Sequence, residues 1–411
     1  MGVMSNVQRS HIPGVYRIFL DDPGTGWVES VVIGIPQVPY TEGPGKPPLL
    51  VMFHSFSVSE LDCEKNSPIF HDALDRGWYV IAPLGANDSN FGIPYSQINV
   101  EYALDLFVPL LPVDTKRIYG LGFSMGGGGI LSYAARHLDP KHTQFAAIIN
   151  HTGNSSIANT FWNSTDTSTF EHPLLFDSTP LTNPFIYSQA SVVDIDFSTD
   201  AVDPATDLAR NLAHIPTLNQ YAINDPILVL VSQTEVLHAW LGLIPGAQSF
   251  ILTPNDDLHH WQTIDSNTAL NFLRSKTLEI PTEGVHQLLA DRDATWFHFD
   301  IKQQLEGAFT PLRWNMENFA NRLTIDECEN LQDITVNTQS VGLNTVVNLE
   351  LVIESGDGTD ETVTLMGYAL QPQEVLRNGV TDLTWSWDSV TKTVSFTETP
   401  LGSPSTWLIR P

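Results

Sequence analysis

Between residues 14 and 280, short apolar runs alternate with segments of helical periodicity. Residues 48–53 (PLLVMF) form a continuous apolar run, which is typical of a strand buried on both of its faces. Alternation of strands and helices predicts a mostly parallel sheet covered by helices on both faces. The predicted strands are 15–20, 27–35, 48–53, 78–82, 117–122, 145–150, 227–232 and 249–252, and the predicted helices are 68–76, 98–111, 125–137 and 263–275.

After about residue 281 the hydrophobic period changes to two. Residues 295–301 (TWFHFDI) and 347–353 alternate between apolar and polar positions, and turn-forming residues at 388–392 separate two later runs. The pattern predicts an antiparallel β domain, a sandwich, over residues 282–411. A first domain then comprises residues 1–281.

The charge of the chain argues against two kinds of partner, nucleic acid and anionic membranes. It has 47 acidic and 19 basic residues, which give a formal net charge of −28. Such a surface repels nucleic acid and disfavours anionic membranes, so we expect neither as a partner. No run of about 18 apolar residues predicts a membrane span. The sequence does not indicate an oligomeric state.

The compartment is left open by the sequence. Residues 1–14 are polar and lack the apolar stretch of a signal peptide. We therefore expect either a cytoplasmic protein or a secreted one whose signal was removed, and we favour secretion. Cys63 and Cys328 match no metal or redox spacing, so two free thiols are expected, with one disulfide between the domains as the alternative.

Gly122-Phe123-Ser124-Met125-Gly126 fits the pattern G-x-S-x-G. A predicted strand ends at Gly122 and a predicted helix begins at Met125, so Ser124 lies on a sharp turn at the carboxyl end of the sheet. The glycines allow a crowded backbone, and the helix amino terminus favours negative charge on a substrate oxygen. This context predicts that Ser124 is the nucleophile of an α/β-hydrolase fold.

A serine hydroxyl needs a base, which in this fold is a histidine late in the chain. The predicted strand 249–252 is followed by the sequence DDLHHW at 256–261. We expect His259 to be the base, and His260 is the alternative.

The acid that orients the histidine is expected between the serine and the histidine along the chain. Glu235 lies just past the predicted strand 227–232 and is our candidate. Asp225 precedes that predicted strand, which places it at the wrong end of the sheet. Asp256 and Asp257 lie on the same loop as the histidine.

Two backbone N–H groups are needed to hold a substrate oxyanion. One is expected from Met125, the residue after the nucleophile, and the other from Phe56, in the loop after residues 48–53. The ring of Phe56 is also a candidate wall of the acyl pocket, together with Trp162 and Trp261.

Several motifs resemble a known family. The chain carries HSF at 54–56, DTKRIY at 114–119, GLGFSMGGGG at 120–129 and FAA at 145–147. They resemble the esterases grouped with poly(3-hydroxybutyrate) depolymerases and feruloyl esterases. The run SMGGGG also resembles cutinase-like and poly(ethylene terephthalate) hydrolases. Over residues 40–280 the resemblance implies the triad Ser124, Glu235 and His259, with Met125 and Phe56 as the oxyanion hole.

The chain departs from that family in three places. The oxyanion loop has His54-Ser55 where His-Gly is usual, and the predicted acid is Glu rather than Asp. Polyester hydrolases carry a Trp after the strand that ends at Asn150, where this chain has His151-Thr152. The third departure argues against aromatic polyesters as substrates, but not against ester hydrolysis.

Residues 152–225 interrupt the alternation and are rich in Asn, Ser, Thr, Pro and aromatic residues. Such a segment is too long for an ordinary loop. It predicts either a cap over the active site or a surface excursion with a small core of its own.

The predicted function is hydrolysis of a carboxylic ester, small or polymeric, through an acyl-enzyme, with no metal or organic cofactor expected. Polyester and plant-polymer esters are the polymeric candidates. A peptidase of the prolyl-oligopeptidase type is the first alternative, disfavoured because such enzymes carry their extra domain before the hydrolase. A catalytically dead binding protein is the second, disfavoured by an intact triad.

The β domain has two predicted roles. Trp296, Trp385 and Trp387 are able to grip a polymer or carbohydrate if they are exposed. Trp in a sandwich is more often part of the core. A domain that only supports the cap is an equally simple alternative.

Overall fold

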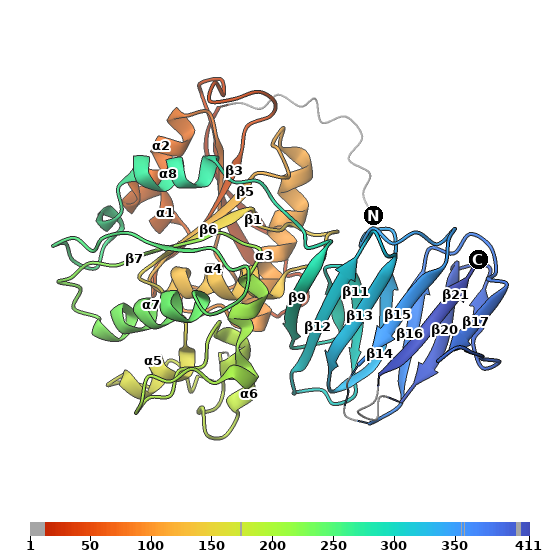
Figure 1. Cartoon of the computed structure of the whole chain (residues 1–411). Helices are drawn as coiled ribbons and strands as arrows, with labels where there is room; N and C mark the ends of the chain where they lie inside the picture. Colours follow the sequence, from red (N-terminus) through yellow and green to blue (C-terminus); the bar gives the residue numbers. More distant parts are fainter. Residues whose placement is uncertain (1–12, 173–174, 355, 357, 400–403) are drawn as a thin grey trace.

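The computed structural model describes residues 13–172, 175–354, 356, 358–399 and 404–411 (Figure 1). Residues 1–12, on which the question of a signal segment depends, lie outside this range. An eight-stranded mixed sheet has the order β1-β2-β4-β3-β5-β6-β7-β8. Its strands are β1 (Gly14–Leu20), β2 (Glu29–Ile35), β3 (Leu49–Phe53), β4 (Tyr79–Pro83), β5 (Ile118–Phe123), β6 (Ala147–His151), β7 (Thr217–Gln220) and β8 (Ser249–Ile251).

The six strands from β4 to β8 in this order run parallel, and β2 is antiparallel to both of its neighbours. All five residues of β3 are buried. Leu49, Val51 and Phe53 belong to one core cluster. Leu50 and Met52 belong to another. Successive side chains of a strand point to opposite faces, so both faces of the sheet are covered, as the sequence predicts.

Helices pack on both faces of this sheet. Residues of α3, α4 and α7 join the first cluster. Residues of α2 and α8 join the second. The α-helices are α1 (Leu61–Asn66), α2 (Pro68–Asp75), α3 (Pro94–Phe107), α4 (Met125–Arg136), α5 (Ile157–Asn163), α6 (Pro184–Ala190), α7 (Leu228–Leu241) and α8 (Ser266–Arg274). Short 3₁₀ helices are η1 (Val108–Leu110), η2 (Pro204–Thr206), η3 (Leu208–Leu212) and η4 (Trp261–Thr263). None of the helices that the structure describes combines the length and the apolarity needed to cross a membrane.

The prediction of a strand at 227–232 is wrong, because these residues lead into and begin helix α7. A uniformly apolar run such as ILVLVS fits a buried helix as well as a strand. The strand at this place in the sheet is β7, with the polar sequence TLNQ. Its Asn219 is fully buried, and its amide donates to Ser249 Oγ and to the carbonyl of Phe250, each at 3.2 Å. These bonds let a polar strand lie inside the sheet.

The predicted interruption at 152–225 is also too long, because β7, at 217–220, belongs to the sheet. The segment between β6 and β7 covers residues 152–216 and carries α5 and α6. Its aromatic residues form a small core that also contains Met125 of α4. The segment therefore shares a small core with Phe91, Ile93 and Met125, the residue after Ser124.

From β9 onward the chain forms two sheets. One has the order β10-β11-β14-β16-β20-β19, and the other has the order β18-β17-β21-β15-β13-β12-β9. Most pairs are antiparallel, but β13–β15 and β14–β16 are parallel. The strands are β9 (Gly284–Ala290), β10 (Ala294–Trp296), β11 (Phe299–Gln303), β12 (Thr310–Glu317), β13 (Arg322–Cys328), β14 (Leu331–Asn337), β15 (Leu349–Ile353), β16 (Glu361–Met366), β17 (Glu374–Arg377), β18 (Val380–Thr381), β19 (Ser386–Asp388), β20 (Thr393–Glu398) and β21 (Ser405–Arg410).

One buried cluster takes residues from both of these sheets, and we propose that they stack as the predicted sandwich. Trp296 is fully buried in that cluster, so it is a core residue and not a gripping one. Trp385 and Trp387 are partly buried and pack against the same cluster. Cys63 and Cys328 are both buried free thiols, as expected.

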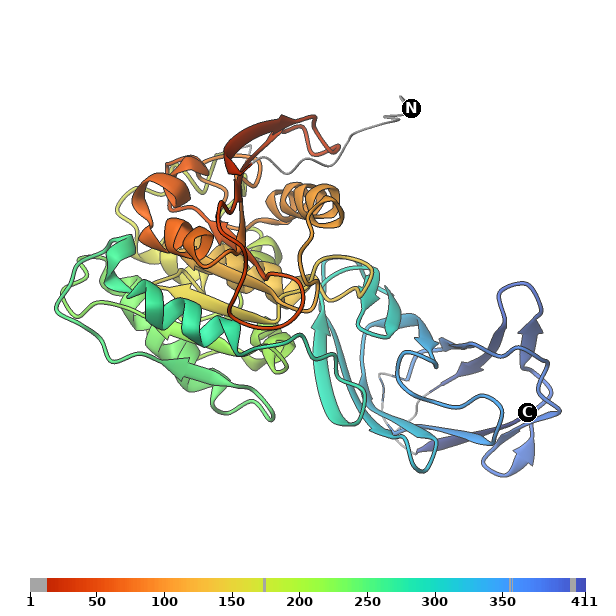
Figure 2. The same ribbon diagram turned by 90° about the horizontal axis from the view of Figure 1, so that it is seen from above.

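Buried polar contacts join β9 to the α/β part, and the later strands extend away from it (Figure 2). The amide of Asn211 donates to the carbonyls of Ala135 at 2.8 Å and Leu289 at 3.0 Å, and its oxygen accepts from Leu289 N at 2.7 Å. Arg136 pairs with Asp291 at 2.6 Å, with side chains that are 3% and 0% exposed. This pair fixes the residue after β9 to the end of α4.

We predict that Asp291→Ala lowers the free energy of unfolding by about 3–5 kcal/mol, because it leaves the buried guanidinium of Arg136 without a counter-charge. Glu350→Ala is the control, since it breaks the half-exposed pair with Arg322 at 2.9 Å and is expected to cost about 0–1 kcal/mol. Urea denaturation of both variants measures the difference. Equal losses would contradict a structural role for the buried pair.

Candidate active site

Ser124 lies on a sharp turn between β5 and α4. Its backbone angles are φ 56° and ψ −120°, a region that residues other than glycine rarely adopt. Its N–H donates to the carbonyl of His151 at 3.0 Å, and its carbonyl accepts from Gly127 N at 2.9 Å. The strained turn holds the hydroxyl at the carboxyl end of the sheet, as the sequence predicts for Ser124.

The glycines around Ser124 are required by close backbone contacts. A Cβ on Gly122 would lie 1.9 Å from the carbonyl oxygen of Gly126. A Cβ on Gly126 would lie 2.3 Å from the carbonyl oxygen of Phe53, at the end of β3. One on Gly128 would lie 2.2 Å from the carbonyl oxygen of Asn154. The first turn of α4 therefore rests directly on the backbone of two other segments.

His259 lies between Ser124 and a carboxylate. Its Nε2 is 2.9 Å from Ser124 Oγ, and its Nδ1 is 2.6 Å from Asp225 Oδ2. The side chain of His259 is 13% exposed and that of Asp225 is 0% exposed. His260 instead pairs with Asp257, with 2.7 Å between Nε2 and Oδ1. The structure thus brings Ser124 and His259 together and leaves His260 outside the contact.

The predicted acid, Glu235, is not part of this arrangement. It lies on α7, where its carboxylate accepts the hydroxyl of Tyr221. Asp225 takes its place because it follows β7 and so lies at the carboxyl end of the sheet. Asp225 is predicted at the wrong end of the sheet when residues 227–232 are taken as the strand. The dipeptide Asp225-Pro226 is a turn signal that marks a loop here.

A cavity of about 450 Å³ opens at Ser124. Phe56, Phe91 and Phe170 line one part of it, and the rings of Phe56 and Phe91 are 5.3 Å apart. Hydroxyl and amide groups of the segment between β6 and β7 line another part, from Thr160, Asn163, Ser164, Thr165 and Thr169. The lining of the cavity therefore contains both aromatic rings and polar groups.

The other two predicted substrate contacts are not found. Trp162 is on α5 and does not line this cavity, and its ring packs edge-on against Phe161. Trp261 is 3% exposed and does not line the cavity, and its ring packs 5.1 Å from that of Phe123. Of the three aromatic candidates, only Phe56 lines the cavity.

The backbone N–H groups of Met125 and Phe56 have no acceptor within the part of the chain that the structure describes. Both residues line the cavity at Ser124. Because Met125 is the first residue of α4, its N–H is one of those that an α-helix leaves unpaired. Two free donors beside a nucleophile are what an oxyanion requires.

His151, at the end of β6, is a buried residue that sequence reasoning noted only as a departure. Its ring nitrogens have no hydrogen-bond partner among the described residues. Its ring lies 4.7 Å from that of Phe123. Burial, and then the charges of His259 and His260, lower the pKa of His151 from 6.5 to about 3. A neutral imidazole therefore packs against Phe123, whose ring also packs against that of His259.

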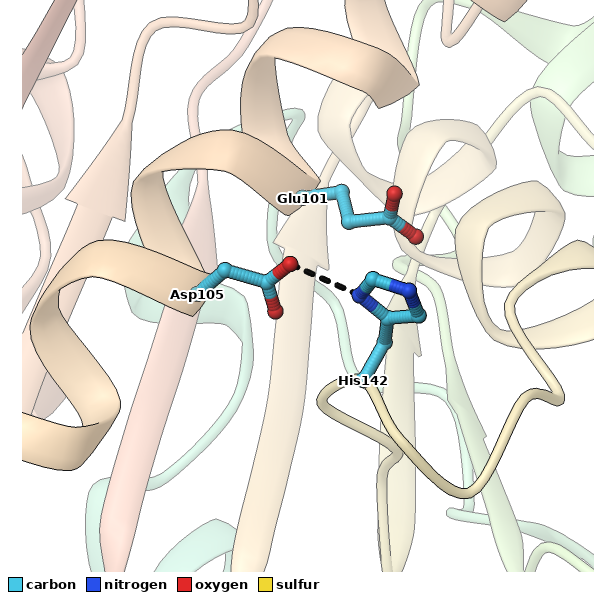
Figure 3. Close-up of side chains that lie close together, drawn as sticks. All are labelled: Glu101, Asp105 and His142. Carbon is cyan, nitrogen blue, oxygen red and sulfur yellow. Dashed lines mark hydrogen bonds and ion pairs between the residues drawn. The ribbon is translucent and has the colours of Figure 1, made fainter.

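One group of side chains in the described residues has the make-up of a metal site. Glu101, Asp105 and His142 bring one ligand atom each within 4.8 Å of one another (Figure 3). Both acids are already paired, Asp105 with His142 at 2.7 Å and Glu101 with His137 at 2.6 Å. His142 precedes the amino end of β6, so the group lies at the edge of the sheet away from Ser124. We assign these residues to ion pairing.

The strand order, the turn at Ser124 and the sequence order Ser124, Asp225, His259 are those of the α/β-hydrolase fold. No family model and no curated protein matches the sequence.

The structure is similar to several solved structures. One is a ferulic acid esterase that is 15% identical in sequence; the match covers 62% of this chain and 95% of that chain, with a TM-score of 0.43. An S-formylglutathione hydrolase from Agrobacterium tumefaciens is 11% identical, covering 64% and 95%, with a TM-score of 0.48. An acylaminoacyl peptidase from Pyrococcus horikoshii is 16% identical, covering 64% and 41%, with a TM-score of 0.46.

We predict that His151 makes the protein less stable as the pH falls from about 6.5 towards 3. In this window the unfolded chain binds a proton that the folded protein excludes, so the unfolded state is favoured by up to about 1.4 kcal/mol per pH unit. His151→Leu should therefore flatten the dependence of the free energy of unfolding on pH between 6 and 4. Ile149→Val, a nearby apolar change in β6, should lower stability without altering the slope. An unchanged slope in the His151 variant would contradict the prediction.

Proposed function

We propose that the protein is a serine hydrolase that cleaves carboxylic esters through an acyl-enzyme. The contact of Ser124 Oγ with His259 Nε2 at 2.9 Å, with Asp225 behind the imidazole, supports this most directly. A base within hydrogen-bond reach of a serine, itself oriented by a buried carboxylate, is the arrangement that activates the hydroxyl.

In the proposed mechanism, Ser124 Oγ attacks the ester carbonyl while His259 Nε2 takes the hydroxyl proton. Asp225 holds the imidazole in the right tautomer and stabilises the imidazolium. The N–H groups of Met125 and Phe56 bind the oxyanion. Collapse of the tetrahedral intermediate breaks the bond to the alcohol, which leaves with the proton from His259. Water then attacks the acyl-enzyme by the same steps and releases the acid.

The cavity supports a proposal about the substrate. We propose that the acyl group lies against Phe56, Phe91 and Phe170, and that the alcohol faces the polar side chains around Thr160. The segment at 152–216 then acts as a cap, because it supplies both the polar lining and Phe170. A volume of about 450 Å³ is within the range of sites for small ligands. Small esters are therefore the first substrates to test, and polymeric esters stay a prediction.

We predict that purified protein hydrolyses 4-nitrophenyl acetate, butyrate or octanoate and that Ser124→Ala abolishes this turnover. Without the Oγ nucleophile no acyl-enzyme forms, so activity should fall by about 10³-fold or more. Release of 4-nitrophenol is followed by its absorbance, and the preferred chain length measures the acyl part of the cavity. Turnover that survives in the Ser124 variant would contradict the proposal.

We predict that Asp225→Asn lowers kcat by about 10⁴-fold, because an amide favours the wrong imidazole tautomer. Glu235→Gln is the matched control on the acid first expected from the sequence. It should change kcat by less than about threefold, since Glu235 contacts Tyr221 rather than His259. A large loss in the Glu235 variant and none in the Asp225 variant would reverse the assignment.

A further inference from the structure

A single buried carboxylate connects the two loops that complete the site. Asp62, on α1, is 7% exposed. Its Oδ2 accepts from Ser55 N at 3.2 Å, from Ser55 Oγ at 2.8 Å and from Trp261 Nε1 at 2.9 Å. Its Oδ1 accepts from the amide of Asn66 at 2.7 Å. One oxygen thus receives donors from residues that are far apart in the sequence.

The two residues that donate to Oδ2, Ser55 and Trp261, are each close in sequence to a group that the proposed mechanism uses. Ser55 precedes Phe56, whose N–H is one of the two oxyanion donors. Trp261 follows His259 by two residues. The ring of Phe123 lies 5.1 Å from that of Trp261 and 4.6 Å from that of His259. The position of the Trp261 indole therefore affects the position of the His259 imidazole in two ways, along the chain and through the packed ring of Phe123.

The surroundings make these bonds strong. The carboxylate of Asp62 is 7% exposed and its donor Trp261 is 3% exposed, so little water competes for the bond between them, while the donor Ser55 is partly buried. Loss of any donor leaves part of a buried charge unsatisfied, which is costly. Asp62 therefore holds the loop of Ser55 and the loop of Trp261 at a set distance from each other.

We propose that Asp62 is a positioning residue for catalysis, which fixes the oxyanion donor of Phe56 relative to His259 and Ser124. This proposal rests on the proposed function. Catalysis demands such a link because a misplacement of about 1 Å in a reacting group can cost about 10²-fold in rate. Asp62 touches neither substrate nor the reacting atoms.

The molecule offers a matched control for a purely structural role. Trp78 is fully buried, and its Nε1 donates to Glu42 Oε2 at 2.8 Å. This bond resembles that of Trp261 with Asp62 in its chemistry and length. Trp78 lies just before the amino end of β4, at the edge of the sheet away from Ser124. A change at Trp78 should therefore affect stability without affecting catalysis.

The first test is kinetic. Trp261→Phe and Ser55→Ala should each lower kcat on a 4-nitrophenyl ester by about 10-fold with little change in KM, whereas Trp78→Phe should not. The double variant of Ser55 and Trp261 should lose about 10–30-fold rather than the product of about 100-fold, because both changes break the same link. A loss equal to the product, or equal effects of the two Trp variants, would overturn the proposal. Asp62→Asn should lose at least as much as either single variant.

The second test does not depend on activity. In hydrogen exchange followed by mass spectrometry, Ser55→Ala should raise exchange in residues 255–264, although Ser55 lies on another loop, and Trp78→Phe should not. No change in 255–264 would overturn the link whether or not the protein turns over an ester. A transmitted change in exchange, combined with no Ser124-dependent turnover by the unmodified protein, would contradict the proposed function and leave the link standing.

Discussion

The first turn of α4 lies in contact with the backbone at the end of β3 and with that of the loop after β6, and the rest of the site depends on this close approach. Gly126 and Gly128 have no room for a Cβ against Phe53 and Asn154. The same turn carries Ser124 in its strained conformation, and Gly126 lies against the carbonyls of Phe53 and His54, at the start of the loop that carries Phe56. The positions of Ser124 and of the two candidate oxyanion donors thus share one packing constraint.

Two layers of polar contacts then complete the arrangement around this turn. Asp225 holds His259 against Ser124. Asp62 holds the loops of Ser55 and Trp261. Both carboxylates are buried, so each interaction is formed where water competes little. The site is therefore built from a strained backbone and a few buried acids rather than from flexible surface groups.

The sequence predicted those parts of the fold that have a strong periodic or motif signal. Each of three patterns fits a single kind of element. They are the apolar run of β3, the G-x-S-x-G turn and the alternation in the C-terminal part. Asp225 was missed because β7 is polar and is stabilised inside the sheet by side-chain hydrogen bonds that no local pattern reveals. The apolar start of α7 was then mistaken for that strand, and the acid moved to Glu235. An error in one element thus moved the proposed acid from Asp225 to Glu235.

Contacts between residues that are far apart in the sequence could not be predicted either, because local patterns do not reveal them. The neutral His151 against Phe123 and the link through Asp62 exist only once the strands are assembled. Likewise, the alternation in residues 295–301 does not tell whether Trp296 is buried or exposed. Its burial follows from the pairing of strands in two sheets.

The central claim, that Ser124 is a nucleophile activated by His259 and Asp225, is tested most directly by covalent labelling with a fluorophosphonate. Intact-mass and peptide measurements should show one adduct, on Ser124, which forms rapidly in the unmodified protein and in Glu235→Gln but slowly in Asp225→Asn and His259→Ala. Labelling at another residue, or labelling of Ser124 that is equally fast in all of these variants, would contradict the account.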